Sequence, residues 1–481
     1  MNDSLAKNAI FSFIKTFLSV AFPIITFAYA SRILSVEGIG EITFSRSIIT
    51  YFSMIALLGI NYYGVREVAR VRDDKTKLSC LCHELFFVNL IMTCFAYFLL
   101  FLSICLVSKF HDYTLLLWVN SITILLTTLG MDWLYQGLEK FGYSAKVSVL
   151  FQIIALIFMF IAVKTSSDVV NYTIVLLISS SGVNIVNFIY SRKFIYFRKI
   201  PCDYSIKKHI APMLWLFAFA VSVQLYTILD STMLGFIKGE YAVGIYTVAI
   251  KANKMTDVLI TSLGVALIPR LAYYIEQKKT EDSEKLIQNA YNFVFMFSIP
   301  CAFGLFVLAP CVIELLSGAG FEDAIITMKI LTPIVVIIPF NVLTNIQIFI
   351  PMKKEKEVII SSSTAALVNL ICNLVLIPTF AENGAAVATV LAEGATSIIC
   401  FIYLRRMIDI STIFKNYYQY WIAAIPILCI GIITNVFVGN IFIRVVIVVF
   451  LSGIVYISIL SKFKNKYYEY AINRFMKKSS C

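Results

Sequence analysis

The sequence predicts an all-α polytopic membrane protein with about fourteen transmembrane helices, and three observations lead to this fold class. Of the 481 residues, 60% are apolar and only 14% are charged, and the mean hydropathy is +0.86. Soluble proteins average about 45–50% apolar and about 25% charged residues. The apolar residues form continuous runs of roughly 20, the length of a spanning helix. A membrane β-barrel would alternate every second residue and is excluded.

We expect one spanning helix at each of the long apolar runs, with boundaries good to a few residues. No small-residue cleavage site follows the first run, so we expect it to be retained rather than removed as a signal peptide. A shorter run at 311–321 predicts an interfacial helix. In chain order the expected spans are 9–31, 39–63, 83–107, 113–136, 146–163, 170–190, 211–237, 242–268, 288–308, 325–350, 358–378, 382–404, 419–437 and 441–460.

The basic residues orient these helices. With the N-terminus in the cytoplasm, 30 of the 40 Lys and Arg residues fall in inside segments and five fall in outside segments. Lys and Arg prefer cytoplasmic loops, so the count predicts an even number of helices with both termini in the cytoplasm. The net charge of +12 is then a consequence of topology, and no nucleic-acid partner is expected. The outside five are Arg32, Lys109, Lys164, Lys238 and Arg444.

A pattern in the second expected helix returns about 204 residues later in the eighth. Its matched pairs are Gly40 with Gly244, Thr43 with Thr247, and Arg66 with Arg270. The pattern predicts two six-helix bundles with pseudo-twofold symmetry, at 1–200 and 201–410. Residues 411–481 then hold the last two helices and a basic tail. The alternative is that any helical hairpin carries turn glycines. Parallel repeats of this kind place a substrate site between the halves, near the membrane midplane.

Six short motifs follow one another between residues 5 and 410. They are Gly-Ile-Asn-Tyr-Tyr-Gly-Val-Arg-Glu-Val-Ala-Arg at 59–70, Trp-Leu-Tyr-Gln-Gly-Leu-Glu-Lys-Phe at 133–141, Asp-Ser-Thr-Met-Leu-Gly at 230–235, Gly-Ile-Tyr at 244–246, Leu-Gly at 263–264 with Pro-Arg at 269–270, and Asn-Gly-Ala-Ala-Val-Ala-Thr at 383–389. In sequence and order these motifs resemble those of bacterial O-antigen and exopolysaccharide repeat-unit flippases, the polysaccharide transporter family of the multidrug/oligosaccharidyl-lipid/polysaccharide exporter superfamily.

The resemblance implies a V-shaped fold of two bundles in the bacterial cytoplasmic (inner) membrane. It implies transfer of an undecaprenyl-pyrophosphate-linked oligosaccharide from the cytoplasmic to the periplasmic leaflet by alternating access. Membrane lipid, a polysaccharide polymerase and a chain-length regulator are the partners it implies. The motifs do not specify the sugar.

Charged residues inside the expected spans are the candidate binding residues, because a charge in lipid is costly unless it faces a cavity or a partner. Lys251 and Lys254 lie about 13 and about 18 Å into the eighth helix, on one face. Arg46 lies on the second helix and Lys15 on the first. The resemblance places these helices around the cleft, so the four cations are expected to clamp a pyrophosphate, which Arg and Lys bind well. The alternatives are a Lys254–Asp257 ion pair, and structural pairing of Lys15 and Arg46 with acids of neighbouring helices.

Three carboxylates within or near the spans suggest ion coupling. Glu41, Asp230 and Glu393 would each bind a proton or sodium ion if burial disfavours the charged form. The alternative is that they form salt bridges with the lysines of the cleft helices. Proton or sodium antiport is therefore a hypothesis.

Other functions fit the sequence less well. A multidrug or cation antiporter of the same fold would need an acidic cleft, and the cations on the cleft helices argue against it. A lipid-linked peptidoglycan-precursor flippase is a second relative. A membrane glycan polymerase or ligase would need a large periplasmic loop, but the longest outside loop, 310–324, carries no Lys or Arg. We therefore expect no enzyme.

No metal and no cofactor are expected. The histidines His83, His111 and His209 show no ligand spacing. The eleven cysteines are scattered, which predicts small buried thiols in a reduced protein.

Overall fold

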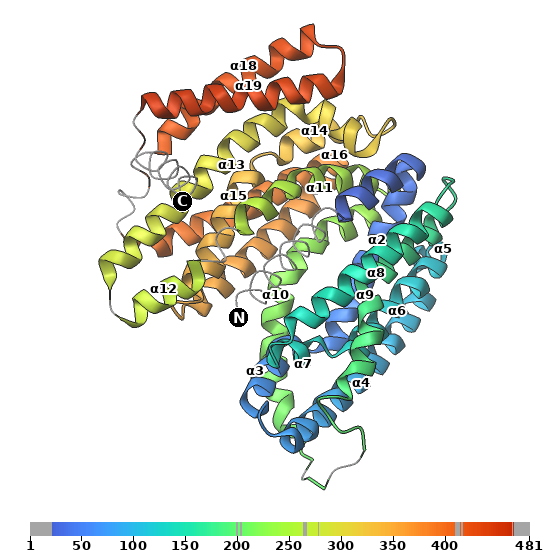
Figure 1. Cartoon of the computed structure of the whole chain (residues 1–481). Coiled ribbons are helices and arrows are strands. Elements are labelled where there is room, and N and C mark those ends of the chain that lie inside the picture. The colour runs from blue at the N-terminus through green and yellow to red at the C-terminus, as the bar shows by residue number, and fades with distance from the viewer. Residues whose placement is uncertain are drawn as a thin grey trace. The chain divides into compact units, whose positions relative to one another are not determined.

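The computed structural model describes residues 22–198, 201–202, 204–262, 267–277, 279–408, 414, 417–463 and 465. Within these ranges the regular secondary structure is helical and no strand occurs, which confirms the predicted fold class. The chain forms two compact units, Met1–Gly244 and Ile245–Cys481, whose helices are labelled in Figure 1.

The first unit is a bundle of long helices. A helix at 22–33 precedes α2, and α6 packs against both α2 and α9 while α8 lies along α9 (Figure 1). The helix α10 packs on α2 and α3 and so belongs to this unit. The elements are α2 (Val36–Leu57), α3 (Ile60–Val71), α4 (Lys75–Leu106), α5 (Lys109–Asp112), α6 (Thr114–Gly130), α7 (Asp132–Gly137), α8 (Phe141–Ala162), α9 (Val169–Ser191) and α10 (Lys207–Ile237).

The second unit begins within α11 and is built around the long helix α13. Figure 1 shows α18 and α19 lying together, and both pack on α13. The elements are α11 (Glu240–Ser262), α12 (Leu267–Glu276), α13 (Thr280–Ser317), α14 (Ala324–Leu331), α15 (Ile334–Val342), the π-helix η2 (Leu343–Phe349), α16 (Glu355–Arg405), α18 (Tyr417–Phe437) and α19 (Ile441–Lys462).

Left-handed backbone breaks two of the expected spans of the first unit. Leu58 (φ 41°) and Gly59 (φ 74°) separate α2 from α3, and Met131 (φ 44°) separates α6 from α7. A Cβ on Gly59 would lie 2.6 Å from the backbone N of Phe217 and 2.7 Å from the carbonyl oxygen of Met213. Glycine is therefore needed here for the positive φ and for the approach of α10.

In the second unit one expected helix is wrong, and two expected helices are joined into one kinked helix. The short interfacial helix expected at 311–321 is wrong, because α13 continues without a break to Ser317. The helix α16 contains one non-helical residue, Ala381 (φ 48°, ψ −127°), which divides its 51 residues at the boundary between the expected runs 358–378 and 382–404. A straight helix of that length would measure about 76 Å, more than twice a hydrocarbon core of about 30 Å. The kink thus allows two crossings.

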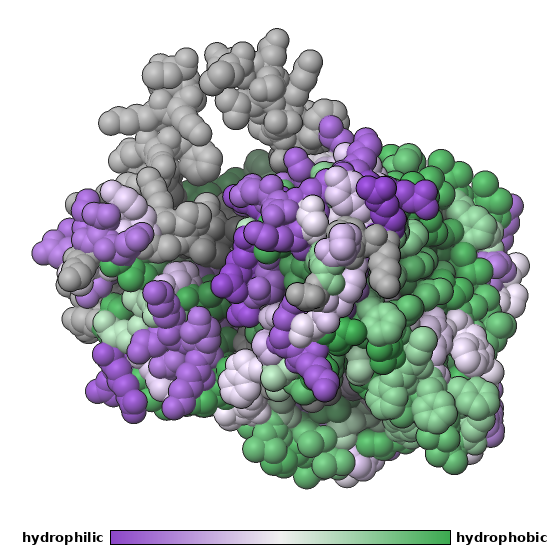
Figure 2. Space-filling view, turned by 90° about the horizontal axis from the view of Figure 1, so that it is seen from below, coloured by the Kyte–Doolittle hydropathy of each residue, from purple (hydrophilic) through white to green (hydrophobic). Residues whose placement is uncertain are grey.

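The surface and interior have the polarity of a membrane protein. Among the described residues, nine helices are long and apolar enough to cross a membrane, or ten if the pair bent by 44° at 332–333 is one span. This number is compatible with the fourteen expected runs, since α16 holds two of them. Large apolar side chains such as Phe101, Leu106 and Phe450 are exposed, whereas Asn89 and Thr93 are buried between helices. Figure 2 shows broad hydrophobic areas beside a region where hydrophilic residues gather. Interiors with small polar residues and apolar exteriors are typical of helices in lipid.

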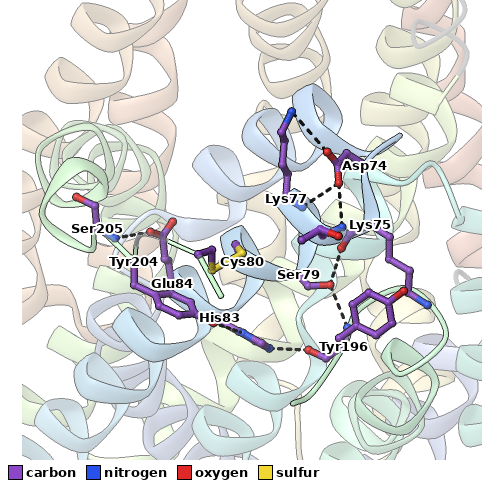
Figure 3. The surroundings of a disulfide bond; sticks show 12 residues. Asp74, Lys75, Lys77, Ser79, Cys80, His83, Glu84, Tyr196, Tyr204 and Ser205 are labelled. Atoms are coloured by element: carbon purple, nitrogen blue, oxygen red, sulfur yellow. Dashed lines mark hydrogen bonds and ion pairs between the residues drawn. A yellow bond between two sulfur atoms is a disulfide. The ribbon is translucent and has the colours of Figure 1, made fainter. Parts of the chain in front are cut away.

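One cysteine pair contradicts the expectation that all thiols are reduced. Cys80, in the second turn of α4, forms a disulfide with Cys202 in the connection between α9 and α10, with their Cα atoms 6.5 Å apart (Figure 3). The other described cysteines are free. The two bonded residues are 122 positions apart, so spacing alone could not have paired them.

Hydrogen bonds around this disulfide tie the same connection to α4. The imidazole of His83 bonds the carbonyl oxygen of Tyr196 at 2.7 Å and the hydroxyl of Tyr204 at 3.2 Å (Figure 3). The hydroxyl of Ser79 accepts the backbone N–H of Tyr196 at 3.0 Å. At the start of α4, the backbone N–H groups of residues 77 and 76 donate to the Asp74 carboxylate and lower its pKa. The α9–α10 connection is therefore anchored on the first turns of α4.

The N-terminal turns of α2 and α11 cross at two glycines. A Cβ on Gly40 would lie 1.9 Å from the carbonyl oxygen of Glu240, and a Cβ on Gly244 would lie 2.1 Å from that of Val36. Both separations are far below van der Waals contact, so only glycine fits at either position. The two contacts are equivalent under the 204-residue offset, because residue 36 corresponds to 240 and 40 to 244. The crossing therefore has local twofold symmetry and gives the sequence repeat a physical reason.

We expect Gly40→Ala to destabilise the protein by about 1–3 kcal/mol, the usual cost of overpacking. The added methyl would collide with backbone, which cannot rotate away. The measurement is thermal unfolding of the purified protein in detergent. Gly304→Ala, where a Cβ meets nothing within 4 Å, is the matched control and should leave the midpoint unchanged or raise it. Equal midpoints for the two variants would contradict the close crossing.

In protein purified under oxidising conditions, we expect two of the eleven cysteines to resist a thiol reagent after denaturation and to react after reduction. The oxidising conditions are needed because the loops that carry this pair are expected in the cytoplasm, where thiols are kept reduced. Cys80→Ser and Cys202→Ser should each abolish the protected pair, and the double variant should be no less stable than either single one. By loop entropy alone the bond is worth about 4–5 kcal/mol as an upper figure. Cys82→Ser, which removes a free neighbouring thiol, is the control and should keep the pair. Full labelling of the wild-type protein without reductant would contradict the bond.

Candidate functional site

The cationic candidate of the first unit is Arg46, at the middle of α2. Its side chain is exposed although the neighbouring positions Ser45 and Ser47 are buried. Its electrostatic neighbour is the buried Tyr172 of α9. Among the described ion pairs none includes Arg46, so pairing with an acid of a neighbouring helix is not observed.

Beside Arg46, hydroxyl groups of α2 and α10 are hydrogen-bonded to one another. This polar seam consists of Ser47 and Tyr51 of α2 and Thr232 of α10. The hydroxyl of Tyr51 donates to that of Thr232 at 3.2 Å, and Thr232 donates to Ser47 at 3.0 Å. Asp230 is buried on α10 and acts electrostatically on Tyr51. The structure therefore brings Asp230 close to the seam and places both beside the segment that carries Arg46.

Glu41 lies at the other candidate position of α2, one residue after the glycine crossing. It is half-buried, and its electrostatic neighbours are Glu240 of α11 and Glu37 of α2. Glu41 makes no ion pair within the described chain. Salt bridging to lysine, the alternative for this carboxylate, is not observed.

In α11 the cationic and acidic residues occupy different faces. Lys251 and Lys254 are exposed, whereas Asn253 and Asp257 are buried. Lys254 acts electrostatically on Asp257, but none of the ion pairs in the described chain joins them. The Lys254–Asp257 ion pair, weighed as an alternative from the sequence, is therefore absent. Both lysines present their ammonium-bearing side chains at the surface of the helix.

Glu393 is buried on α16 and held by α15. The side-chain amide of Asn341 donates to its Oε2 at 2.8 Å and to its backbone carbonyl at 3.0 Å. The hydroxyl of Ser397 donates to the amide oxygen of Asn341 at 2.7 Å. Asp257 lies within electrostatic range of Glu393. The second unit thus places two buried carboxylates, one on α11 and one on α16, within electrostatic range of each other.

The predicted set is only partly brought together. Lys15 lies outside the described residues. Arg46, Glu41 and Asp230 belong to the first unit, and Lys251, Lys254 and Glu393 belong to the second. No group of three or more His, Cys, Asp or Glu residues in the described ranges could hold a metal ion.

Sequence reasoning missed a charged cluster around the buried Glu84 in the first unit. Glu84 of α4 accepts the Nε2–H of His209 at 2.8 Å and pairs with Lys208 at 2.9 Å, and the Nδ1 of His209 bonds the hydroxyl of Tyr63 at 2.7 Å. The backbone N–H of Ser205 also donates to Glu84 at 2.5 Å. The cluster joins α3, α4 and α10. Its members are up to 146 residues apart, so nothing in the sequence marked them as neighbours.

Two family models match the chain. One, described as "Polysaccharide biosynthesis protein", covers residues 5–275, and one described as "MatE" covers 216–378. A "Putative O-antigen transporter" of Escherichia coli (strain K12) is 23% identical over 418 residues, which are 84% of this chain and 97% of that protein. It is a transporter by its name, not an enzyme.

Solved structures share the fold. The "Lipid II flippase MurJ, inward closed conformation" superimposes with a TM-score of 0.73 at 17% identity, over 96% of this chain and 99% of its own. An inward-facing multidrug resistance MATE family transporter of the MOP superfamily superimposes with a TM-score of 0.65 at 17% identity, over 85% of this chain and 99% of its own. These matches confirm the resemblance drawn from the motifs. The first family model spans more than half of the chain, and this multi-pass membrane protein therefore belongs to the polysaccharide biosynthesis protein family.

Proposed function

We propose that this protein is a flippase that moves an undecaprenyl-pyrophosphate-linked oligosaccharide from the cytoplasmic to the periplasmic leaflet of the bacterial inner membrane by alternating access. The observation that carries the proposal is the presence of exposed cations within two of the expected spanning segments. Arg46 on α2 and Lys251 and Lys254 on α11 are exposed. A charge in a spanning helix is retained when it serves a ligand or a cavity, and an anionic head group such as pyrophosphate is the natural ligand for Arg and Lys. Lys15 is the fourth member of the proposed cationic site.

The names of the relatives support the same substrate class. The curated Escherichia coli relative is called an O-antigen transporter, and the solved MurJ structure is called a lipid II flippase. Both substrates named there carry sugars, and the second is a lipid. The opposite case, a multidrug or cation antiporter of the same fold, would favour acidic rather than basic exposed side chains on α2 and α11. The two bundles proposed for alternating access are 1–200 and 201–410, with 411–481 as an appendix.

The proposed orientation has both termini in the cytoplasm. Loops assigned to the cytoplasm from their charge lie at one end of the first unit. Arg72 after α3 pairs with Glu139 before α8 at 2.9 Å, and the ammonium of Lys75 donates to the carbonyl oxygen of Lys193 at 3.2 Å. Lys109, assigned to the outside, donates instead to the carbonyl oxygen of Gly235. A polymerase and a chain-length regulator are proposed partners on the basis of the family resemblance.

Ion coupling is part of the proposal and involves Glu41, Asp230 and Glu393. Each is half-buried or buried within the described chain. A buried carboxylate is unfavourable unless its charge is neutralised, and a proton or sodium ion that binds and leaves would supply that neutralisation. An ion gradient would then supply direction to a transport step that has no chemical energy source of its own.

We expect Arg46→Ala and Lys254→Ala to abolish rescue of surface polysaccharide in a strain that lacks the gene. Loss of one charged contact costs about 1.5–3 kcal/mol, or roughly 10- to 100-fold in substrate affinity. The measurements are staining of surface glycan, the leaflet location of the lipid-linked units, and the membrane level of each variant. Lys329→Ala removes a charge on α14 whose ammonium lies over the ring of Phe306 and is the control that should still rescue. If the deletion strain keeps its glycan and becomes sensitive to cationic drugs, the antiporter function replaces this one.

We expect flipping of a fluorescent lipid-linked oligosaccharide in proteoliposomes to depend on a proton or sodium gradient. Collapse of the coupling gradient with an ionophore should reduce the initial rate to that of protein-free vesicles. Glu393→Gln should remove the dependence, and Glu322→Gln, at an exposed turn, should not. Rates that ignore both gradients would refute ion coupling while leaving the substrate assignment intact.

A further inference from the structure

The buried carboxyl group of Asp257 has no hydrogen-bond partner among the residues that the structure describes. Only 7% of this residue is exposed, and both carboxylate oxygens are buried without a donor in reach. An ionised carboxylate in that position would lose its hydration and gain nothing in exchange, which is among the most unfavourable arrangements in a protein. A neutral, protonated carboxyl group avoids this cost.

The charged groups around Asp257 favour the same state. Glu393 of α16 is a second carboxylate within electrostatic range, and it disfavours another negative charge nearby. Lys254 on its own helix is the opposing cation, but it lies on the exposed face and forms no ion pair with it in the described structure. From α14 the nearest basic residue is Lys329, whose ammonium lies over the ring of Phe306. Among the residues that the structure describes, Lys254 and Glu393 are the charged groups that act on Asp257.

The two carboxylates have opposite hydrogen-bond environments. Glu393 accepts the side-chain N–H of Asn341 at 2.8 Å, a bond that stabilises the ionised form, whereas Asp257 accepts none. One turn before Asp257, the amide oxygen of Asn253 is also buried without a donor. This part of α11 therefore carries three unsatisfied acceptor oxygens. A pair of acids whose surroundings differ in this way divides into one neutral and one charged member.

The ligand that fits this site is a proton. No group of three or more His, Cys, Asp or Glu residues in the described ranges could hold a metal ion. A proton on Asp257 removes the buried charge and supplies a donor where acceptors are in excess.

We propose that Asp257 is a proton-binding residue that controls Lys254, and through it the affinity for an anionic head group. When Asp257 holds a proton, Lys254 has no competing carboxylate on its own helix and is available to a pyrophosphate. When the proton leaves, the new negative charge one turn away attracts the ammonium of Lys254 and competes with the anion. The second step of this inference rests on the proposed function, and the first does not.

The test of the proton site is infrared spectroscopy of the reconstituted protein as a function of pH. We expect a carboxylic acid carbonyl band that persists to mildly alkaline pH and disappears in Asp257→Asn. Asp282→Asn, an exposed acid at the start of α13, is the matched control and should keep the band. A spectrum in which Asp257→Asn and wild type are identical would overturn the assignment.

The test of coupling is binding of undecaprenyl pyrophosphate to detergent-solubilised protein from mildly acid to mildly alkaline pH, in sodium-free buffer. The wild-type Kd should rise roughly 10-fold more than that of Asp257→Asn, a usual size for coupling between two sites. Asp257→Asn should bind tightly throughout, and Lys254→Ala weakly throughout. Because both proteins bind the same probe, comparing their Kd values at each pH cancels the titration of the probe's own pyrophosphate. The Kd of Asp282→Asn should follow that of the wild type.

Three outcomes would count against the proposal in different ways. Equal pH dependence in wild type and Asp257→Asn would overturn the coupling. A Kd that follows sodium at constant pH would replace the proton with a sodium ion. Absence of binding by the wild type at every pH, with the infrared band intact, would refute the proposed substrate and the coupling while the proton site stands.

Discussion

The close crossing of α2 and α11 constrains the molecule most strongly. Gly40 and Gly244 each face a backbone carbonyl oxygen of the other helix at a distance where a methyl group could not fit. Because backbone cannot move aside like a side chain, the crossing fixes both the separation and the register of the two helices. The first turn of α11 is therefore held directly against the first turn of α2, within the first unit.

Polarity is distributed in this protein as a membrane requires. Large apolar side chains face outward, and serines, threonines and asparagines fill the spaces between helices. Most of these bond within their own helix or to a neighbouring one, as Asn89 does with the carbonyl oxygen of residue 56 at 2.6 Å. Against that background Asp257 is an exception. Its two carboxylate oxygens, like the amide oxygen of Asn253 one turn earlier, are buried without a donor. Such unsatisfied groups are costly, and such costs are most often tolerated where they serve function.

In the first unit, the charged cluster around Glu84 between α3, α4 and α10 has a different role. The Glu84 carboxylate pairs with His209 and Lys208 and accepts a backbone N–H. The disulfide of Cys80 lies one turn earlier on the same helix. These contacts bind the connection before α10 to α4, so α10 cannot separate from the first unit without breaking them. This arrangement explains why α10 packs with the first unit, although the sequence repeat groups it with the helices that follow.

The sequence by itself determined the all-α membrane class, the order of the helices, the family and the charged residues within the spans. These follow from local properties, because hydropathy, loop charge and short motifs are each read within about 20 residues. Only the tertiary structure decided that Lys254 and Asp257 are not paired, that Asp257 meets Glu393, and that Cys80 bonds Cys202. Each of these depends on how helices rotate and pack, and packing is a non-local property that residue spacing along one helix does not contain.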